Sequence, residues 1–112
     1  MKEIDTGYAV VYIEFGRRRL QRCYHEQRVA EATWGRQVAR RYVAAIGLLK
    51  AAHRPSDLRK FRALNYHQLK ADRKGEHVLE LGARERLIFT VREGDKALIA
   101  RIEEVSTTHY DR

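Results

Sequence analysis

The chain has 112 residues, 44% of them hydrophobic, which is enough for one compact domain with a modest core and too little for two. Its 23 lysines and arginines outnumber 15 aspartates and glutamates, which gives a formal net charge of +8. This excess of positive charge favours a polyanionic partner such as nucleic acid, because neutralising phosphates releases condensed counterions. An anionic membrane surface or an acidic protein would match the same charge. The single cysteine, Cys23, excludes an intrachain disulfide and a cysteine-based metal site, and it fits a reduced, cytoplasmic setting.

The first expected element is a strand over residues 8–15, YAVVYIEF, which is β-branched and aromatic and ends at Gly16. This apolar run is short and is cut by Glu14, so it is not a signal peptide, and no segment is long enough to span a bilayer. Residues 17–26 predict a short first helix. A longer second helix is predicted by apolar residues three and four apart: Val38, Tyr42, Ala45, Ile46 and Leu49. Gly35 marks either the start of this second helix or a kink in it.

The second helix must end near Pro55, because the residue before a proline is pushed out of the α region. Four strand-like runs follow, over residues 66–70, 76–81, 84–92 and 96–105, with glycine-containing turns between them. The sequence therefore predicts a single α+β domain over residues 1–112: an N-terminal strand, two helices, then a four-strand antiparallel meander, with the helices on one face of the sheet.

Alternation along the third of these runs separates the two faces of the predicted sheet. Leu87 and Phe89 should meet the helices, whereas Arg84 and Arg86 should lie on the face that the helices leave open. Two like charges on alternate residues repel weakly unless an anion lies across them, which suggests an anionic ligand.

Two segments resemble the HigB branch of the RelE/ParE toxins. Residues 67–75, HQLKADRKG, are similar to that branch's His-Pro-Leu-Lys-Gly-Asp-Arg run, and residues 85–89, ERLIF, are similar to its Trp-Arg-Leu-Ile-Phe strand. An upstream Phe-Gly-x-x-x-Leu over residues 15–20 also matches. The likeness follows the element order of nearly the whole chain and is specific over residues 67–89. Glu85 stands where the branch has tryptophan, which removes a platform for base stacking, and Gln68 replaces its proline.

The resemblance implies a small bacterial toxin that cuts mRNA on the translating ribosome and is neutralised by a cognate antitoxin, expected to carry a helix-turn-helix. By position, His67 matches the family's first active-site histidine, Lys70 its RNA-contacting lysine, and Arg86 the arginine that follows the tryptophan. The family's C-terminal Asp-Tyr-His cluster corresponds here to residues 109–111, His-Tyr-Asp, in reversed order. Which of His109 and Tyr110 reaches the substrate is left open by this reversal.

These residue types suit metal-free RNA cleavage, in which the ribose 2′-OH is the nucleophile. The protein must then take one proton, give one, and stabilise a phosphorane; histidine suits the proton steps and arginine the phosphate oxygens. We expect His67 or His109 to be the general base and the other the acid, Arg86 to clamp the phosphate, and Tyr110 to orient or stack. No cofactor is expected, and the remaining histidines have no metal-ligand spacing.

Four further basic residues are candidates for RNA contact: Lys70, Arg73, Lys74 and Arg84. Lys70 is expected to position the substrate, whereas Arg73 and Lys74 are more simply explained as the solvated residues of a turn. Two rival functions share the fold. One is a ParE-like inhibitor of DNA gyrase, whose members typically lack the histidine–arginine–tyrosine set; the other is a non-catalytic, phage-derived nucleic-acid-binding protein.

Overall fold

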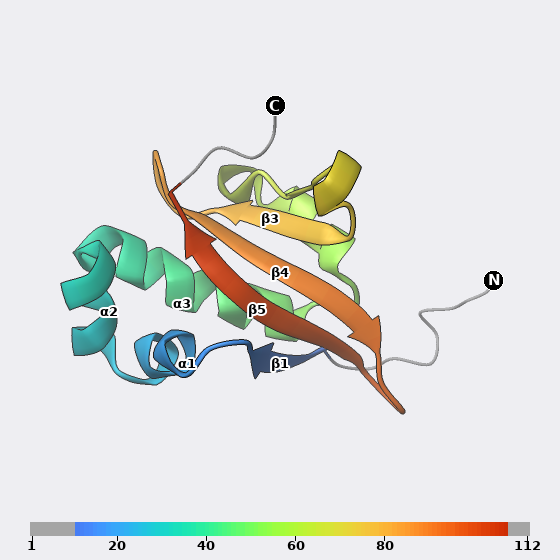
Figure 1. Ribbon diagram of the computed structural model, residues 1–112, viewed down its shortest axis with the longest axis horizontal. Helices are drawn as coiled ribbons and strands as arrows, with labels where there is room; N and C mark the ends of the chain where they lie inside the picture. Colours follow the sequence, from blue (N-terminus) through green and yellow to red (C-terminus); the bar gives the residue numbers. More distant parts are fainter. Residues whose placement is uncertain (1–10, 108–112) are drawn as a thin grey trace.

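The computed structural model describes residues 11–107, which form a layer of helices packed on one mixed sheet (Figure 1). The helices and strands, in chain order, are β1 (Val11–Phe15), α1 (Arg18–His25), α2 (Gln27–Trp34), α3 (Arg36–Ala51), β2 (His67–Gln68), β3 (Glu76–Glu80), β4 (Arg86–Glu93) and β5 (Leu98–Ser106). Three short 3-10 helices lie between α3 and β3: η2 (Pro55–Lys60), η3 (Arg62–Leu64) and η4 (Ala71–Arg73). None of the helices in this part of the chain is long and apolar enough to cross a membrane.

The five strands lie in the order β1-β5-β4-β3-β2. From β2 to β5 each strand runs antiparallel to the next, as a meander requires, but β1 pairs with β5 in parallel, Val11 opposite Leu98. The sheet as a whole is therefore mixed and five-stranded rather than a four-strand antiparallel sheet. Parallel pairing is available to β1 because the chain between β1 and β5 is a long crossover, which parallel neighbours need.

The expectation of two helices was wrong, because the described chain has three before β2. Residues 17–26 do form a helix, α1, but a separate helix, α2, follows at once and ends at Gly35. Gly35 has φ +88° and ψ 164°, a conformation that side-chain-bearing residues rarely adopt, and α3 begins at the next residue. Of the two roles weighed for Gly35, the start of the long helix is the correct one.

The helices cover one face of the sheet, and α3 runs behind the strands in Figure 1. Buried residues of α3, among them Tyr42, Ile46 and Leu49, join Leu87 and Phe89 of β4 in the main core. The alternation predicted for β4 is thus confirmed. The Tyr42 hydroxyl donates a hydrogen bond of 2.7 Å to the Leu20 carbonyl, which ties α3 to α1 inside this core. Cys23 is fully buried on α1, as expected of a small core residue.

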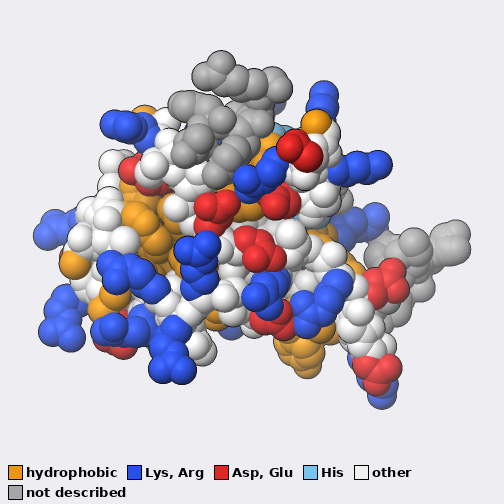
Figure 2. Space-filling view, viewed as in Figure 1, with side chains coloured by type: hydrophobic (Ala, Val, Ile, Leu, Met, Phe, Trp, Pro, Cys, Tyr) orange, Lys and Arg blue, Asp and Glu red, His pale blue; other side chains and the backbone are white. Residues whose placement is uncertain are grey.

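The open face of the sheet is polar, and Figure 2 shows acidic and basic side chains mixed across it. Glu14 of β1 accepts from Arg92 at 2.7 Å and from Arg101 at 2.8 Å, and these two bonds lower the pKa of Glu14 from 4.5 to about 2. Arg73 of η4 bonds Glu76 at 2.7 Å and Glu104 at 3.2 Å. The ion pairs therefore join β1, β4 and β5 toward the β1 edge of this face and hold η4 against β3 and β5.

Candidate functional site

Arg86 begins β4 on the open face, as the alternation predicted, but its side chain is only 10% exposed. Its Nη2 lies 3.8 Å from Glu80 Oε2, a loose ion pair. Its Nε and Nη1 are buried and make no hydrogen bond within residues 11–107. A buried donor without an acceptor costs about 1–3 kcal/mol, so such groups are rare in a folded chain, and these two nitrogens point to an acceptor that residues 11–107 do not supply.

The β3–β4 turn places Arg86 at this position. Backbone N–H groups of Leu81 and Gly82 both donate to the Glu85 carbonyl, at 2.9 and 3.3 Å, so β4 starts one residue later. A Cβ on Gly82 would lie 2.8 Å from Glu85 Oε1 and 3.2 Å from Val38 Cγ2, so a side chain there would displace the end of the Glu85 side chain and press on Val38. Arg84 was expected within the strand; it lies instead in this turn, where it is exposed, because the turn bonds take up the residues before Arg86.

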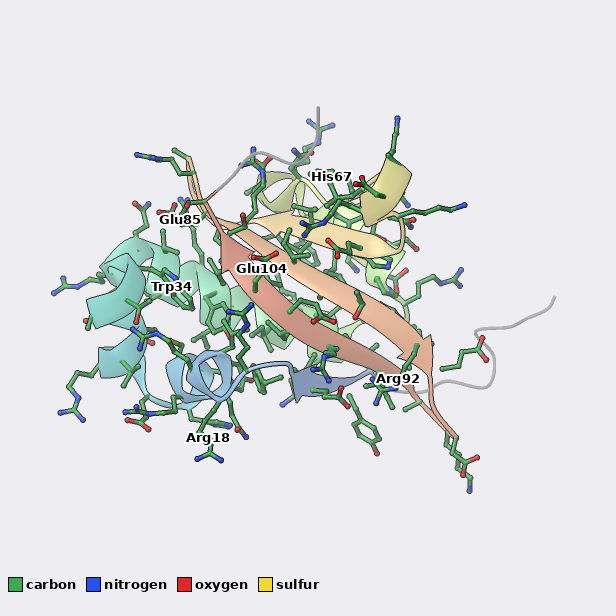
Figure 3. The ribbon with its side chains drawn as sticks, in the orientation of Figure 1. Arg18, Trp34, His67, Glu85, Arg92 and Glu104 are labelled. Atoms are coloured by element: carbon green, nitrogen blue, oxygen red, sulfur yellow. The ribbon has the colours of Figure 1, made fainter. Side chains whose placement is uncertain are left out.

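His67 lies on β2, opposite Val78 of β3. Its Nδ1 is 2.8 Å from the carbonyl oxygen of Asn65. Because a carbonyl can only accept, Nδ1 carries a hydrogen, and in the neutral imidazole Nε2 is then the basic atom. Figure 3 shows the imidazole at the β2 edge of the sheet.

The strand register brings His67 and Arg86 to neighbouring rows of the same face. His67 is opposite Val78, and Val78 is opposite Ile88, two residues after Arg86 on β4. With two strand spacings across and two residues along, the two Cα atoms lie about 12 Å apart. The guanidinium of Arg86 leans toward β3, as its contact with Glu80 shows.

Sequence reasoning missed two residues at this site, Asn65 and Glu80. Asn65 Nδ2 donates a 2.8 Å hydrogen bond to the same Glu80 oxygen that faces Arg86. Glu80 lies directly opposite Arg86 in the register. Glu80 could have been found from the alternation along residues 76–81, because that pattern puts Glu80 on the same face of the sheet as Val78. No sequence pattern pointed to Asn65.

The other predicted RNA contacts differ in their surroundings. Lys70 and Lys74 are exposed on either side of η4. Arg73 is half-buried, and its guanidinium takes part in the ion pairs with Glu76 and Glu104 already described. RNA contact by these three residues stays a prediction. His109 and Tyr110, the remaining catalytic candidates, lie outside the described residues.

No group of three or more histidine, cysteine or acidic side chains in the described chain is arranged to hold a metal ion. The side chains of the site itself supply a histidine whose Nδ1 carries the hydrogen and a buried guanidinium whose Nε and Nη1 have no acceptor within residues 11–107.

Comparison with known proteins bears on the fold. No family model matches the sequence, and no curated protein matches it. Among solved structures, the chain is similar to a YoeB/ParE toxin from Agrobacterium tumefaciens, with 9% identity and a TM-score of 0.56, over 88% of this chain and 99% of that one. The chain thus shares the fold of this YoeB/ParE toxin. At this identity the likeness concerns the fold, and the HigB branch stays a prediction.

Proposed function

We propose that this chain is the toxin of a type II toxin–antitoxin system and acts in the cytoplasm as a ribosome-dependent mRNA endonuclease. The observation that carries the proposal is Arg86, a nearly buried arginine with two unsatisfied N–H groups on the same sheet face as His67. Arginine's planar fork matches two oxygens of a phosphate, and a phosphodiester would supply the acceptors that residues 11–107 lack.

The reaction we propose begins with His67 Nε2 removing the proton of the ribose 2′-OH. The 2′ oxygen attacks the adjacent phosphorus, the bond to the 5′ oxygen breaks, and that oxygen takes a proton from the general acid, for which His109 is the candidate. The products are a 2′,3′-cyclic phosphate and a free 5′-OH. Arg86 stabilises the charge that gathers on the non-bridging oxygens, and loss of one such stabilising group typically costs about 3 kcal/mol, or roughly 100-fold in rate.

Two further features support this reading. The fold is one that a YoeB/ParE toxin also has, and a net charge of +8 favours association with the phosphates of mRNA and ribosome. The partner that would neutralise the chain is a cognate antitoxin, expected to be encoded beside it with a helix-turn-helix.

The test uses purified chain with ribosomes carrying a short labelled mRNA. Wild type should cut the mRNA and leave a 2′,3′-cyclic phosphate, Arg86→Met should cut about 100-fold more slowly, and His67→Gln should lose the base-dependent limb of the pH profile. Arg28→Met, which removes an exposed arginine of α2 outside the candidate site, is the control and should retain the wild-type rate. Unchanged cutting by Arg86→Met would contradict the proposed role of the arginine.

A further inference from the structure

We infer that Asn65 is a positioning residue with two roles. Its backbone carbonyl keeps the hydrogen of the His67 ring on Nδ1, and its side chain keeps Glu80 from pairing closely with Arg86. The importance of Asn65 for catalysis rests on the proposed function. Its contacts with His67 and Glu80 can nevertheless be tested without RNA. One residue between η3 and β2 thereby couples the candidate base to the candidate phosphate clamp.

The backbone contact depends on an uncommon conformation. Asn65 has φ 44° and ψ 53°, in the left-handed region, and its N–H donates to the Arg62 carbonyl at 3.0 Å. Asparagine is, after glycine, the residue best suited to this region. The Asn65 carbonyl is 2.8 Å from His67 Nδ1, two residues on, so it holds the hydrogen on that nitrogen and leaves Nε2 as the base. An imidazole without such an acceptor exchanges between two neutral tautomers, of which one has no basic Nε2.

The side-chain contact acts on Arg86 through Glu80. Asn65 Nδ2 donates to Glu80 Oε2 at 2.8 Å, and that oxygen is 3.8 Å from Arg86 Nη2. A free carboxylate opposite a buried arginine would close to a two-bond pair of about 2.8 Å and neutralise it. The amide holds the carboxylate back, so that Nε and Nη1 of Arg86 have no acceptor among the described residues and can bind phosphate.

Two substitutions separate these contacts. Asn65→Gly keeps the left-handed backbone and the carbonyl, so His67 should keep its hydrogen on Nδ1, but it removes the amide and should let Glu80 close on Arg86. Adding Glu80→Gln to that variant removes the competing carboxylate and should restore the clamp. Ala71→Gly is the matched control, because Ala71 is the other non-glycine residue of positive φ in the described chain, at +57°.

The experiment is ¹⁵N NMR of the full chain, with the exposed His53 ring as internal reference and inorganic phosphate as the probe of Arg86. We expect His67 in the Nδ1–H form in wild type and in Asn65→Gly, and phosphate binding at the Arg86 Nε–H about tenfold weaker in Asn65→Gly. Binding should return to within about threefold of wild type in Asn65→Gly/Glu80→Gln and be unchanged in Ala71→Gly; misplacement of a binding group commonly has effects of this size.

The rate of mRNA cleavage by Asn65→Gly should fall by the same factor as its affinity for phosphate. The pH at which the cleavage rate levels off should stay that of wild type. An Nε2–H tautomer in wild type, or wild-type phosphate affinity in Asn65→Gly, would overturn the inference. If instead both NMR results are as expected and wild type cuts no mRNA, Asn65 retains its positioning role and the proposed function is what fails.

Discussion

Replacing Arg86 with methionine should make the folded chain more stable while it removes the proposed activity. Methionine is unbranched and fills an irregular space much as the arginine stem does, without N–H groups. In wild type, Nε and Nη1 of Arg86 are buried and find no acceptor within residues 11–107, at a cost of about 1–3 kcal/mol each. The substitution also loses the 3.8 Å pair with Glu80, a side chain 29% exposed that keeps its bond to Asn65, and a pair of this kind is worth at most about 1 kcal/mol. The net expectation is a gain of about 2 kcal/mol in the free energy of unfolding.

For a chain of this size each kcal/mol moves the melting temperature by about 4 °C, so Arg86→Met should melt about 8 °C higher. Urea unfolding at pH 7, followed by circular dichroism, measures the free energy directly. The exposed Arg84, changed to methionine, is the control and should stay within about 0.5 kcal/mol of wild type. A loss of 1 kcal/mol or more in Arg86→Met would refute the reasoning, because it would mean that the buried N–H groups stabilise the fold and are not held ready for a ligand.

Three further predictions concern buried and ion-paired groups. Tyr42→Phe removes the hydroxyl bonded to the Leu20 carbonyl inside the core and should cost about 1–2 kcal/mol in urea unfolding; no loss would mean that this carbonyl finds another donor. The pKa of Glu14 is lowered to about 2, so the contribution of its ion pairs to the free energy of unfolding is complete above pH 4.5 and disappears as the pH falls through 2. The difference in free energy of unfolding between wild type and Glu14→Gln should shrink over that range. A constant difference would contradict the ion pairing. Burial lowers the pKa of His77 below 6.5, so on acidification the unfolded chain binds a proton at this residue more readily than the folded chain does. Between pH 7 and pH 5 the urea midpoint should therefore fall more steeply in wild type than in His77→Phe. Equal slopes would contradict this.

The sequence predicted local features of the fold better than its long-range pairings. Alternation assigned both faces of β4 correctly, because Leu87 and Phe89 reach the main core while Ile88 packs with Leu69 and Val78 on the other face. Helix α2 was missed because Ala30 is its only fully buried residue, and one such residue gives too weak an apolar repeat to predict a helix. The parallel pairing of β1 with β5 was also missed, since a strand's own residues do not specify its neighbour.

The candidate site was predicted by residue type but not by environment. Period-two spacing gives the face on which Arg86 lies, whereas its burial follows from the β3–β4 turn and from Glu80 across the register. Arg73 shows the converse: a basic residue in a turn is expected to be solvated, yet Glu76 of β3 and Glu104 of β5 hold it against the sheet. The contact with Glu104 joins residues 31 apart in sequence, and no local spacing pattern contains it.

The most direct test of the central claim is primer-extension mapping of one mRNA in cells induced for wild type, Arg86→Met or Arg28→Met, with a second copy of the mRNA that lacks its start codon. We predict cuts in the translated mRNA with wild type and Arg28→Met, about 100-fold less cutting with Arg86→Met, and no cuts in the untranslated copy. Growth arrest by wild type with the translated mRNA intact would contradict the account and would favour a ParE-like inhibitor of gyrase.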